Sequence, residues 1–264
     1  MTSLHFGSSE APLYGAFQPA VTTLDRDHAV LLCAPLGHEY MRTHWLLRRL
    51  ATALSSSGYA SLCFDYNGYG DSGGDSGVGT PSLWADNISM AADELVALSG
   101  ARHLSVVTLR AASLLVSHAD LSAFACETLV MLDPVASGDQ WISDLEALQQ
   151  RQNLRHAGGP AMRTRPASPE QGLEEYLGAV FPTDTKSSLQ ELRYANQPDY
   201  QFRKIRTINS AAMTPDPDAS RVWQAWAGDY AESICADSLY WADAEHARGC
   251  ILPPNLPSAL VCLI

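Results

Sequence analysis

Positive charge is scarce in this 264-residue chain. Its 17 lysines and arginines stand against 29 aspartates and glutamates, so the formal net charge is −12 at pH 7. Nucleic acids and anionic membranes attract basic surfaces, so we expect neither as a partner. No apolar run approaches the ~20 residues of a membrane span, and residues 1–6 lack the basic and apolar regions of a secretory signal. These absences predict a cytoplasmic protein.

Motifs that bind metals, phosphates or redox partners are missing as well. The six cysteines are dispersed and form no Cys-x-x-Cys pair, which argues against a zinc knuckle or a dithiol site. The glycine-rich stretch 67–79 lacks the Gly-Lys-Ser/Thr of a phosphate-binding loop. We therefore expect reduced, buried thiols, no metal and no cofactor. The composition leaves the oligomeric state open.

The chain does contain alternating strand-like and helical patterns. Residues 28–34 and 103–109 are largely apolar runs, typical of strands buried on both faces. Residues 42–56 place apolar side chains at helical spacing, and a further helix is expected to begin at Pro81 and Trp84 and to end near Ser99. Further strands are expected at 13–17, 59–65, 127–133, 204–210 and 232–237, and further helices at 111–119, 218–226 and 253–264. This alternation predicts a mostly parallel sheet flanked by helices, with a ligand site at the carboxyl ends of the strands.

Residues 139–200 differ in composition from the rest of the chain, being richer in Gln, Arg, Glu and Pro. Helical segments are expected near 139–153, 169–180 and 186–195. We interpret 139–200 as a helical cap inserted into a core made of 1–138 and 201–264. Such a cap would cover the carboxyl ends of the strands.

Three motifs occur in an order that points to one family. Pro35-Leu36-Gly37-His38-Glu39 follows a strand, Asp65-Tyr-Asn-Gly-Tyr-Gly-Asp-Ser72 follows the next, and Asp133-Pro134-Val135 follows a later one. The arrangement resembles the α/β-hydrolase superfamily, in particular serine aminopeptidase-like proteins and the hydrolases associated with the exosortase A system. The resemblance extends over residues 10–145. It implies an α/β-hydrolase fold, a mostly parallel sheet flanked by helices with a helical cap insertion.

The turn that carries the nucleophile in this family lacks a serine. The family pattern is Gly-x-Ser-x-Gly, whereas this chain has Thr108-Leu-Arg-Ala-Ala112, with Arg110 at the nucleophile position. A guanidinium stays protonated in proteins and cannot attack a carbonyl. Arg110 would either bind an acidic group of a ligand at the start of the following helix, or pair internally with Asp133, Asp65 or Glu39.

The resemblance also implies an oxyanion hole built from backbone amides. Leu36 and Gly37 stand where the family has one donor, and Ala111 would supply the other. The alternative is an inherited turn that binds nothing. Trp141 belongs to a set of aromatic residues in the cap and the last third of the chain, which fit either an apolar ligand or ordinary packing.

Three titratable residues are candidates for proton transfer. Asp133 would act as a general base if it lay near a ligand, or would cap the following helix through its Asp-Pro turn. His38 adjoins the oxyanion turn and would shuttle a proton in a pocket, or would face water. His246 follows the last predicted strand, where the family has its catalytic histidine, but it lacks the usual Gly-His context. A solvated surface histidine is the alternative there.

Three functions are compatible with these residues. The first is an enzyme without the Ser-His-Asp triad that acts on a small molecule or peptide with an acidic group. It would catalyse epimerisation, isomerisation, elimination or cyclisation in a biosynthetic pathway. The second is a non-catalytic protein that binds a ligand or peptide. The third is an esterase, thioesterase or amidase whose nucleophile lies elsewhere in the chain.

Overall fold

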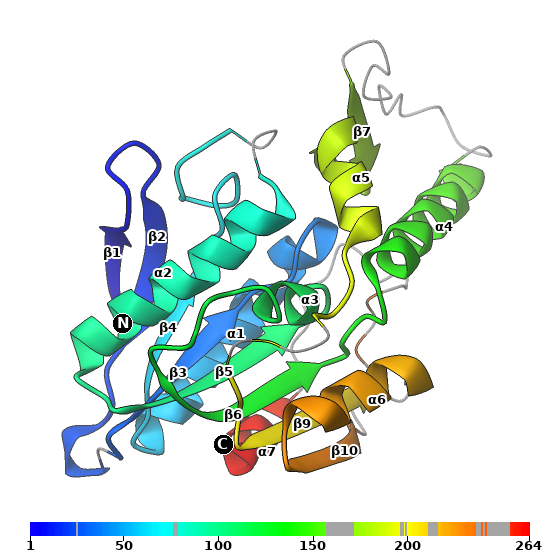
Figure 1. Cartoon of the computed structure of the whole chain (residues 1–264). Helices are drawn as coiled ribbons and strands as arrows, with labels where there is room; N and C mark the ends of the chain where they lie inside the picture. Colours follow the sequence, from blue (N-terminus) through cyan, green and yellow to red (C-terminus); the bar gives the residue numbers. More distant parts are fainter. Residues whose placement is uncertain are drawn as a thin grey trace.

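The computed structural model of the protein (Figure 1) describes residues 1–24, 26–75, 79–156, 172–195, 198, 200–210, 216–235, 239, 241 and 254–264. The main sheet contains β1 (Thr2–Phe6), β2 (Leu13–Gln18), β3 (His28–Cys33), β4 (Ala60–Phe64), β5 (His103–Leu109), β6 (Ala125–Leu132), β9 (Lys204–Ser210) and β10 (Asp229–Cys235). Its strand order is β1-β2-β4-β3-β5-β6-β9-β10. β2 pairs antiparallel with β1 and with β4, and the other neighbouring pairs are parallel. The predicted mostly parallel sheet is confirmed.

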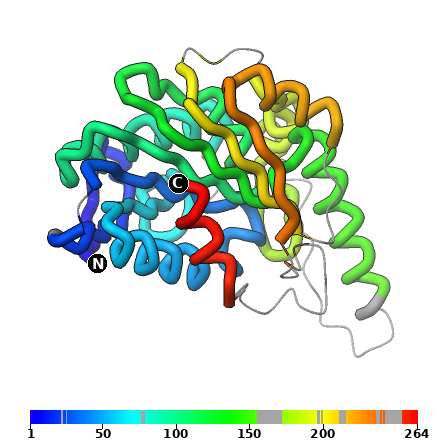
Figure 2. Tube along the Cα trace, turned by 90° about the horizontal axis from the view of Figure 1, so that it is seen from below, coloured from blue at the N-terminus to red at the C-terminus, as the bar shows by residue number. Residues whose placement is uncertain are grey.

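Helices cover both faces of this sheet. The described helices are α1 (His38–Ser56), α2 (Pro81–Ser99), α3 (Ala112–Val116), α4 (Gly138–His156), α5 (Thr183–Glu191), α6 (Pro217–Trp226) and α7 (Leu256–Leu263). Of these, α4 and α5 lie at the carboxyl ends of the strands and not on a face of the sheet. In β3, Val30 and Leu32 belong to the apolar layer shared with α1 and α7, whereas Leu31 belongs to the layer shared with α2 and α3. Figure 2 shows α7, in red, lying beside α1. The central strands are buried on both faces, which explains their continuous apolar runs.

Most helices and strands follow the sequence, but β1 was not predicted and one segment of the insertion differs from the expectation. β5 and β9 have the predicted bounds, 103–109 and 204–210. The helix expected near 169–180 is wrong for the described residues, which form a hairpin of β7 (Leu173–Tyr176) and β8 (Ala179–Pro182). Leu177 and Gly178 both have positive φ, 55° and 90°. A two-residue turn of this kind matches the twist of paired strands and overrides the helical propensity of Leu-Glu-Glu-Tyr.

The insertion lies at the carboxyl ends of the parallel strands. Figure 1 shows α4, α5 and β7 beyond the arrowheads of β5 and β6. The Thr185 hydroxyl of α5 donates to the carbonyl oxygen of Gly79 at 2.9 Å, which joins the insertion to the segment that leads into α2. The division into a core of 1–138 and 201–264 and a cap of 139–200 stays a prediction. Within the described residues, no helix is both long and apolar enough to cross a membrane.

Candidate functional site

The turn after β5 keeps a sharp, strained geometry although it has no glycine. Arg110 has φ 53°, in the left-handed region that non-glycine residues rarely adopt. Its amide donates to the Leu132 carbonyl at 3.0 Å, and its own carbonyl accepts from the amide and the hydroxyl of Ser113. These bonds hold the turn in place, and such a conformation costs about 1–3 kcal/mol. The sharp turn after β5 therefore forms without a glycine.

The Arg110 side chain is buried and paired within the protein. Its Nε donates to Glu39 Oε1 at 2.9 Å, and its Nη1 donates to the Asp133 carbonyl at 3.1 Å. The guanidinium carbon lies 5.6 Å from the centre of the Trp241 ring. Arg110 and Glu39 are only 4% and 2% exposed. Of the two interpretations of Arg110, the structure favours internal pairing, and the partner is Glu39.

Asp133 is also engaged within the protein. It follows β6 with φ 45° and is fully buried. One carboxylate oxygen accepts from the Ser210 amide at 2.6 Å, and the other accepts from Trp241 Nε1. Burial raises the pKa of Asp133, while these two hydrogen bonds oppose the rise. The carboxylate thus links the ends of β6 and β9 to Trp241, and it does not line the groove described below.

The residues expected to form an oxyanion hole occupy the expected turns, but one amide already has a partner. Gly37 has φ 63°, a conformation that favours glycine, and its amide donates to the hydroxyl of Tyr69 at 3.0 Å. Leu36 packs in the core. Ala111 is buried and precedes α3, which has only five residues. The Gly37 amide would therefore reach a ligand only if Tyr69 moved.

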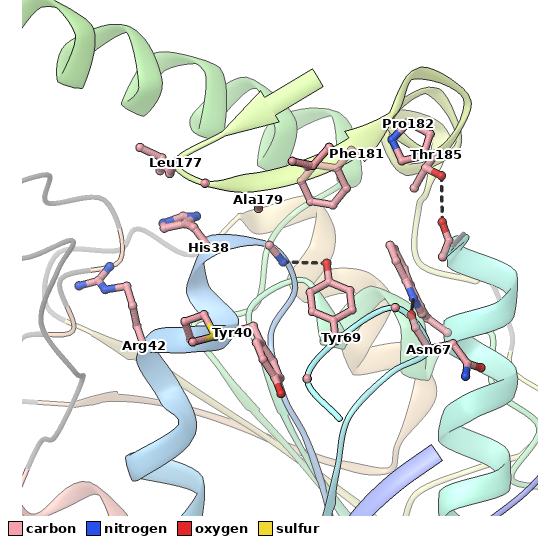
Figure 3. Close-up of a pocket in the computed structure, with 18 of the residues that line it drawn as sticks. His38, Tyr40, Arg42, Asn67, Tyr69, Leu177, Ala179, Phe181, Pro182 and Thr185 are labelled. Carbon is pink, nitrogen blue, oxygen red and sulfur yellow. Dashed lines mark hydrogen bonds between the residues drawn. The ribbon is translucent and has the colours of Figure 1, made fainter. Parts of the chain in front are cut away.

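An open groove of about 780 Å³ lies beside the elbow. It is bounded by the start of α1, the glycine-rich loop after β4 and the β7–β8 hairpin (Figure 3). The lining residues are Gly37, His38, Tyr40, Met41, Arg42, Asn67, Gly68, Tyr69, Gly70, Gly79, Trp84, Gln152, Leu177, Gly178, Ala179, Val180, Phe181, Pro182 and Thr185. Arg110 and Asp133 are not among them. The accessible space thus lies at the start of α1 and does not reach the Arg110 side chain.

Two basic side chains of α1 stand at this groove. His38 is 9% exposed, and neither ring nitrogen has a hydrogen-bond partner among the described residues. Burial lowers the pKa of His38 and favours the neutral imidazole. Arg42, one turn further along α1, donates from Nη1 to the Trp241 carbonyl at 3.1 Å. Among the described lining residues, Arg42 is the one with a formal charge at pH 7.

Aromatic rings form much of the remaining wall. Tyr69 packs edge-on against Tyr40 and Trp84, with ring centres 5.3 and 5.7 Å apart. On the opposite side, Phe181 of the hairpin packs edge-on against Trp141 at 6.1 Å. Trp141 is 1% exposed, so it supports the groove from behind without lining it. Aromatic walls of this kind suit a flat or acyl ligand.

Sequence reasoning missed several residues of this groove. Tyr69, Arg42 and the hairpin were not singled out, although Tyr69 lies within the glycine-rich motif after β4 that identified the fold. His246 lies outside the described residues. The groove has no serine or cysteine among its described lining residues, and the Thr185 hydroxyl is bonded to Gly79. In the described part of the chain, no cluster of His, Cys, Asp and Glu could hold a metal ion.

Comparisons with known proteins identify the fold. No protein-family model matches the chain, and no curated protein matches it either. Among solved structures, it is similar to Est1E from Butyrivibrio proteoclasticus with ferulic acid bound, at 15% identity and a TM-score of 0.64, over 98% of this chain and 96% of that one. It is also similar to a putative hydrolase from Agrobacterium vitis S4, at 14% identity and a TM-score of 0.62, over 100% and 98% of the two chains. A third similar structure is proline iminopeptidase from Mycobacterium smegmatis, at 11% identity and a TM-score of 0.58, over 99% and 97%. The chain has the α/β-hydrolase fold.

Proposed function

We propose that this protein is a non-hydrolytic member of the α/β-hydrolase fold that binds a small organic molecule in the groove. One observation carries the proposal: a buried Arg110–Glu39 ion pair occupies the turn after β5, where the sequence comparison with α/β-hydrolases places the nucleophile. Neither partner can form an acyl-enzyme there, because the guanidinium is protonated and the carboxylate is engaged by it. The described lining of the neighbouring groove offers no replacement serine or cysteine.

The groove walls indicate the kind of molecule that would bind. The hairpin contributes an apolar side with Ala179 and Phe181, and Tyr69 lies across the groove from them (Figure 3). Val180 and Trp84 add further apolar and aromatic surface to the lining. The similar Est1E structure contains ferulic acid, an aromatic carboxylic acid. We therefore expect a small molecule with an aromatic or acyl portion, and ferulate is a suitable first probe.

The test separates binding from hydrolysis. The protein is incubated with ethyl ferulate and with a fluorophosphonate probe, beside active Est1E as the control, and ferulate binding is measured by calorimetry. We expect saturable ferulate binding, no released acid and no labelled serine. Stoichiometric labelling of a serine, or ester turnover by the purified protein, would overturn the proposal. Absence of any binding by ferulate or its ester would also count against it.

A second candidate is catalysis by proton transfer, with His38 as the base. The observation that favours it is the position of His38 at the groove, where burial lowers the pKa of the imidazole and favours its neutral form. Such an imidazole can accept a proton from carbon next to a carbonyl, the step shared by epimerisation, isomerisation and elimination. Asp133 does not serve in this scheme, because its oxygens are occupied by Ser210 and Trp241.

The measurement for this second candidate is exchange of solvent deuterium into a carbonyl compound that binds the groove, followed by NMR. Exchange that is lost in His38→Phe would establish the proton transfer. Binding without exchange in the wild-type protein would leave the non-catalytic function as the better description.

A further inference from the structure

The β7–β8 hairpin borders the groove with the backbone edge of β8. Every residue of β8, Ala179–Pro182, lines the groove, and Figure 3 shows Ala179 and Phe181 along this wall. No residue of β7 is among the described lining residues. Successive side chains of a strand point to opposite faces, so a face of β8 would contribute only alternate residues. Lining by four consecutive residues therefore indicates that the edge of the strand, and not only its Phe181 face, borders the space.

The pairing of the hairpin determines which backbone groups this edge offers. β7 and β8 pair antiparallel, with Glu175 opposite Val180. One step beyond the ladder, the Thr183 amide donates to the Gly172 carbonyl at 2.8 Å. Hydrogen-bonded and non-hydrogen-bonded residue pairs alternate along an antiparallel ladder. Because Val180 lies three pairs from the bonded pair of Thr183 and Gly172, its N–H and C=O point away from β7.

A proline at the next outward position supports this assignment and limits what can pair with the edge. Pro182 lies two residues from Val180 and has no N–H to donate. Proline is tolerated in a sheet where its position does not need a ladder N–H, as on the outward side of an edge strand. β8 thus offers one outward donor, the Val180 N–H, and the carbonyls of Val180 and Pro182 as acceptors. Proline on an edge blunts pairing with a further protein strand, so this edge suits one amide unit of a small molecule.

The outward groups of Val180 are not used by the rest of the protein. Within the described residues, neither its N–H nor its C=O has a hydrogen-bond partner. Val180 is half-buried, and the Ala179 and Phe181 side chains beside it give the strand an apolar face. A ligand that displaced water from this edge without replacing the hydrogen bonds would leave two backbone groups unpaired, at a cost in affinity. The edge therefore selects a ligand that carries both an acceptor and a donor.

Resting on the proposed function, we propose that β8 binds a secondary amide of the ligand, and that the ligand is an N-acylated amino acid amide. The Val180 N–H donates to a carbonyl oxygen of the ligand, and the Val180 carbonyl accepts an N–H of the ligand, as in an antiparallel strand pair. The aromatic or acyl group lies on the face of Ala179 and Phe181, because the neighbours of a paired unit point to the opposite face from Val180.

The experiment compares two ligands that differ in one N–H. N-feruloylglycine N-methylamide carries both partners for Val180, and its ester analogue has oxygen in place of the glycine N–H. We expect calorimetry at pH 7 to show that the amide binds about five- to tenfold more tightly, because the ester loses one hydrogen bond and leaves the Val180 carbonyl unpaired.

Three variants test the Val180 N–H. Val180→Pro removes this donor and keeps the ladder bonds of the hairpin, so we expect both ligands to bind about five- to tenfold more weakly. Val180→Ala keeps the N–H and separates the loss of the side chain from the loss of the donor. Glu175→Pro is the matched control, because Glu175 lies opposite Val180 and its outward N–H is on the other edge of the same hairpin. It should leave both affinities unchanged.

Circular dichroism and thermal melting of each variant identify misfolding, and the comparison of amide and ester on the wild-type protein remains decisive if Val180→Pro disrupts the hairpin. Equal affinity for amide and ester would overturn the amide site while preserving the groove as a binding site. Losses in Val180→Ala or Glu175→Pro that match the loss in Val180→Pro would do the same. Absence of binding by both compounds and by ferulate, or hydrolysis of the ester analogue, would instead overturn the proposed function itself.

Discussion

The ion pair between Arg110 and Glu39 should stabilise the fold only as a pair. We consider Arg110→Leu, which leaves Glu39 without its partner although that carboxylate is 2% exposed. The remaining oxygen, Oε2, already lacks a hydrogen-bond partner in the described structure. An isolated buried carboxylate loses its hydration and gains no compensating interaction.

The expected magnitude follows from this burial. Removing one partner of a buried pair costs about 3–5 kcal/mol, and the lost bond from Nη1 to the Asp133 carbonyl adds about 1 kcal/mol. The double variant with leucine at positions 39 and 110 removes both charges. Replacement of a buried pair by apolar residues is often neutral or stabilising. We therefore expect the free energy of unfolding of the double variant to be within about 2 kcal/mol of the wild-type value. It should be well above that of Arg110→Leu.

Urea unfolding followed by tryptophan fluorescence at pH 7 measures these differences. The control is Arg102→Met, which breaks the Arg102–Asp27 pair on the surface, where the two side chains are 82% and 35% exposed. Exposed pairs contribute about 0–1 kcal/mol, so this variant should change stability little. An Arg110→Leu variant within about 1 kcal/mol of wild type, or a double variant as unstable as the single one, would refute the reasoning.

Two further predictions concern pH and the packing of the insertion. We expect the free energy of unfolding to fall as the pH is lowered from 6.5 toward 4. Burial lowers the pKa of His28 from 6.5 to about 4, so in this pH range the unfolded state binds a proton at His28 that the folded state does not bind. Urea unfolding at pH 7 and pH 5 should show a smaller drop for His28→Gln, and an identical drop in both proteins would contradict the assignment. Gly138→Ala should cost about 1–3 kcal/mol, since its Cβ would overlap the Leu189 carbonyl and force α4 away from α5. In the same unfolding assay Gly228→Ala, where a Cβ meets nothing within 4 Å, is the control, and equal stabilities of these two variants would disprove the packing argument.

Most of the fold was predictable because its signals are local. A strand such as β3 shows a continuous apolar run because both of its faces are covered, and β5 is recognisable for the same reason. The hairpin of β7 and β8 was not predicted, since Leu173–Tyr176 has no apolar alternation and its pairing depends on the turn at Leu177 and Gly178. Contacts formed in the tertiary structure outweigh weak local propensity in such short segments.

The site was less predictable because its contacts join distant parts of the chain. The sequence by itself determined that Arg110 stands at the elbow and that Asp133 ends the next strand, since both follow from the order of strands and turns. Only the tertiary structure decided what these side chains face. Glu39 is 71 residues from Arg110, and Gly37 is 32 residues from Tyr69. The start of α1 packs across the turn after β5, so Glu39 pairs with Arg110 there and the groove forms at the start of α1. No local sequence pattern encodes this packing of distant segments.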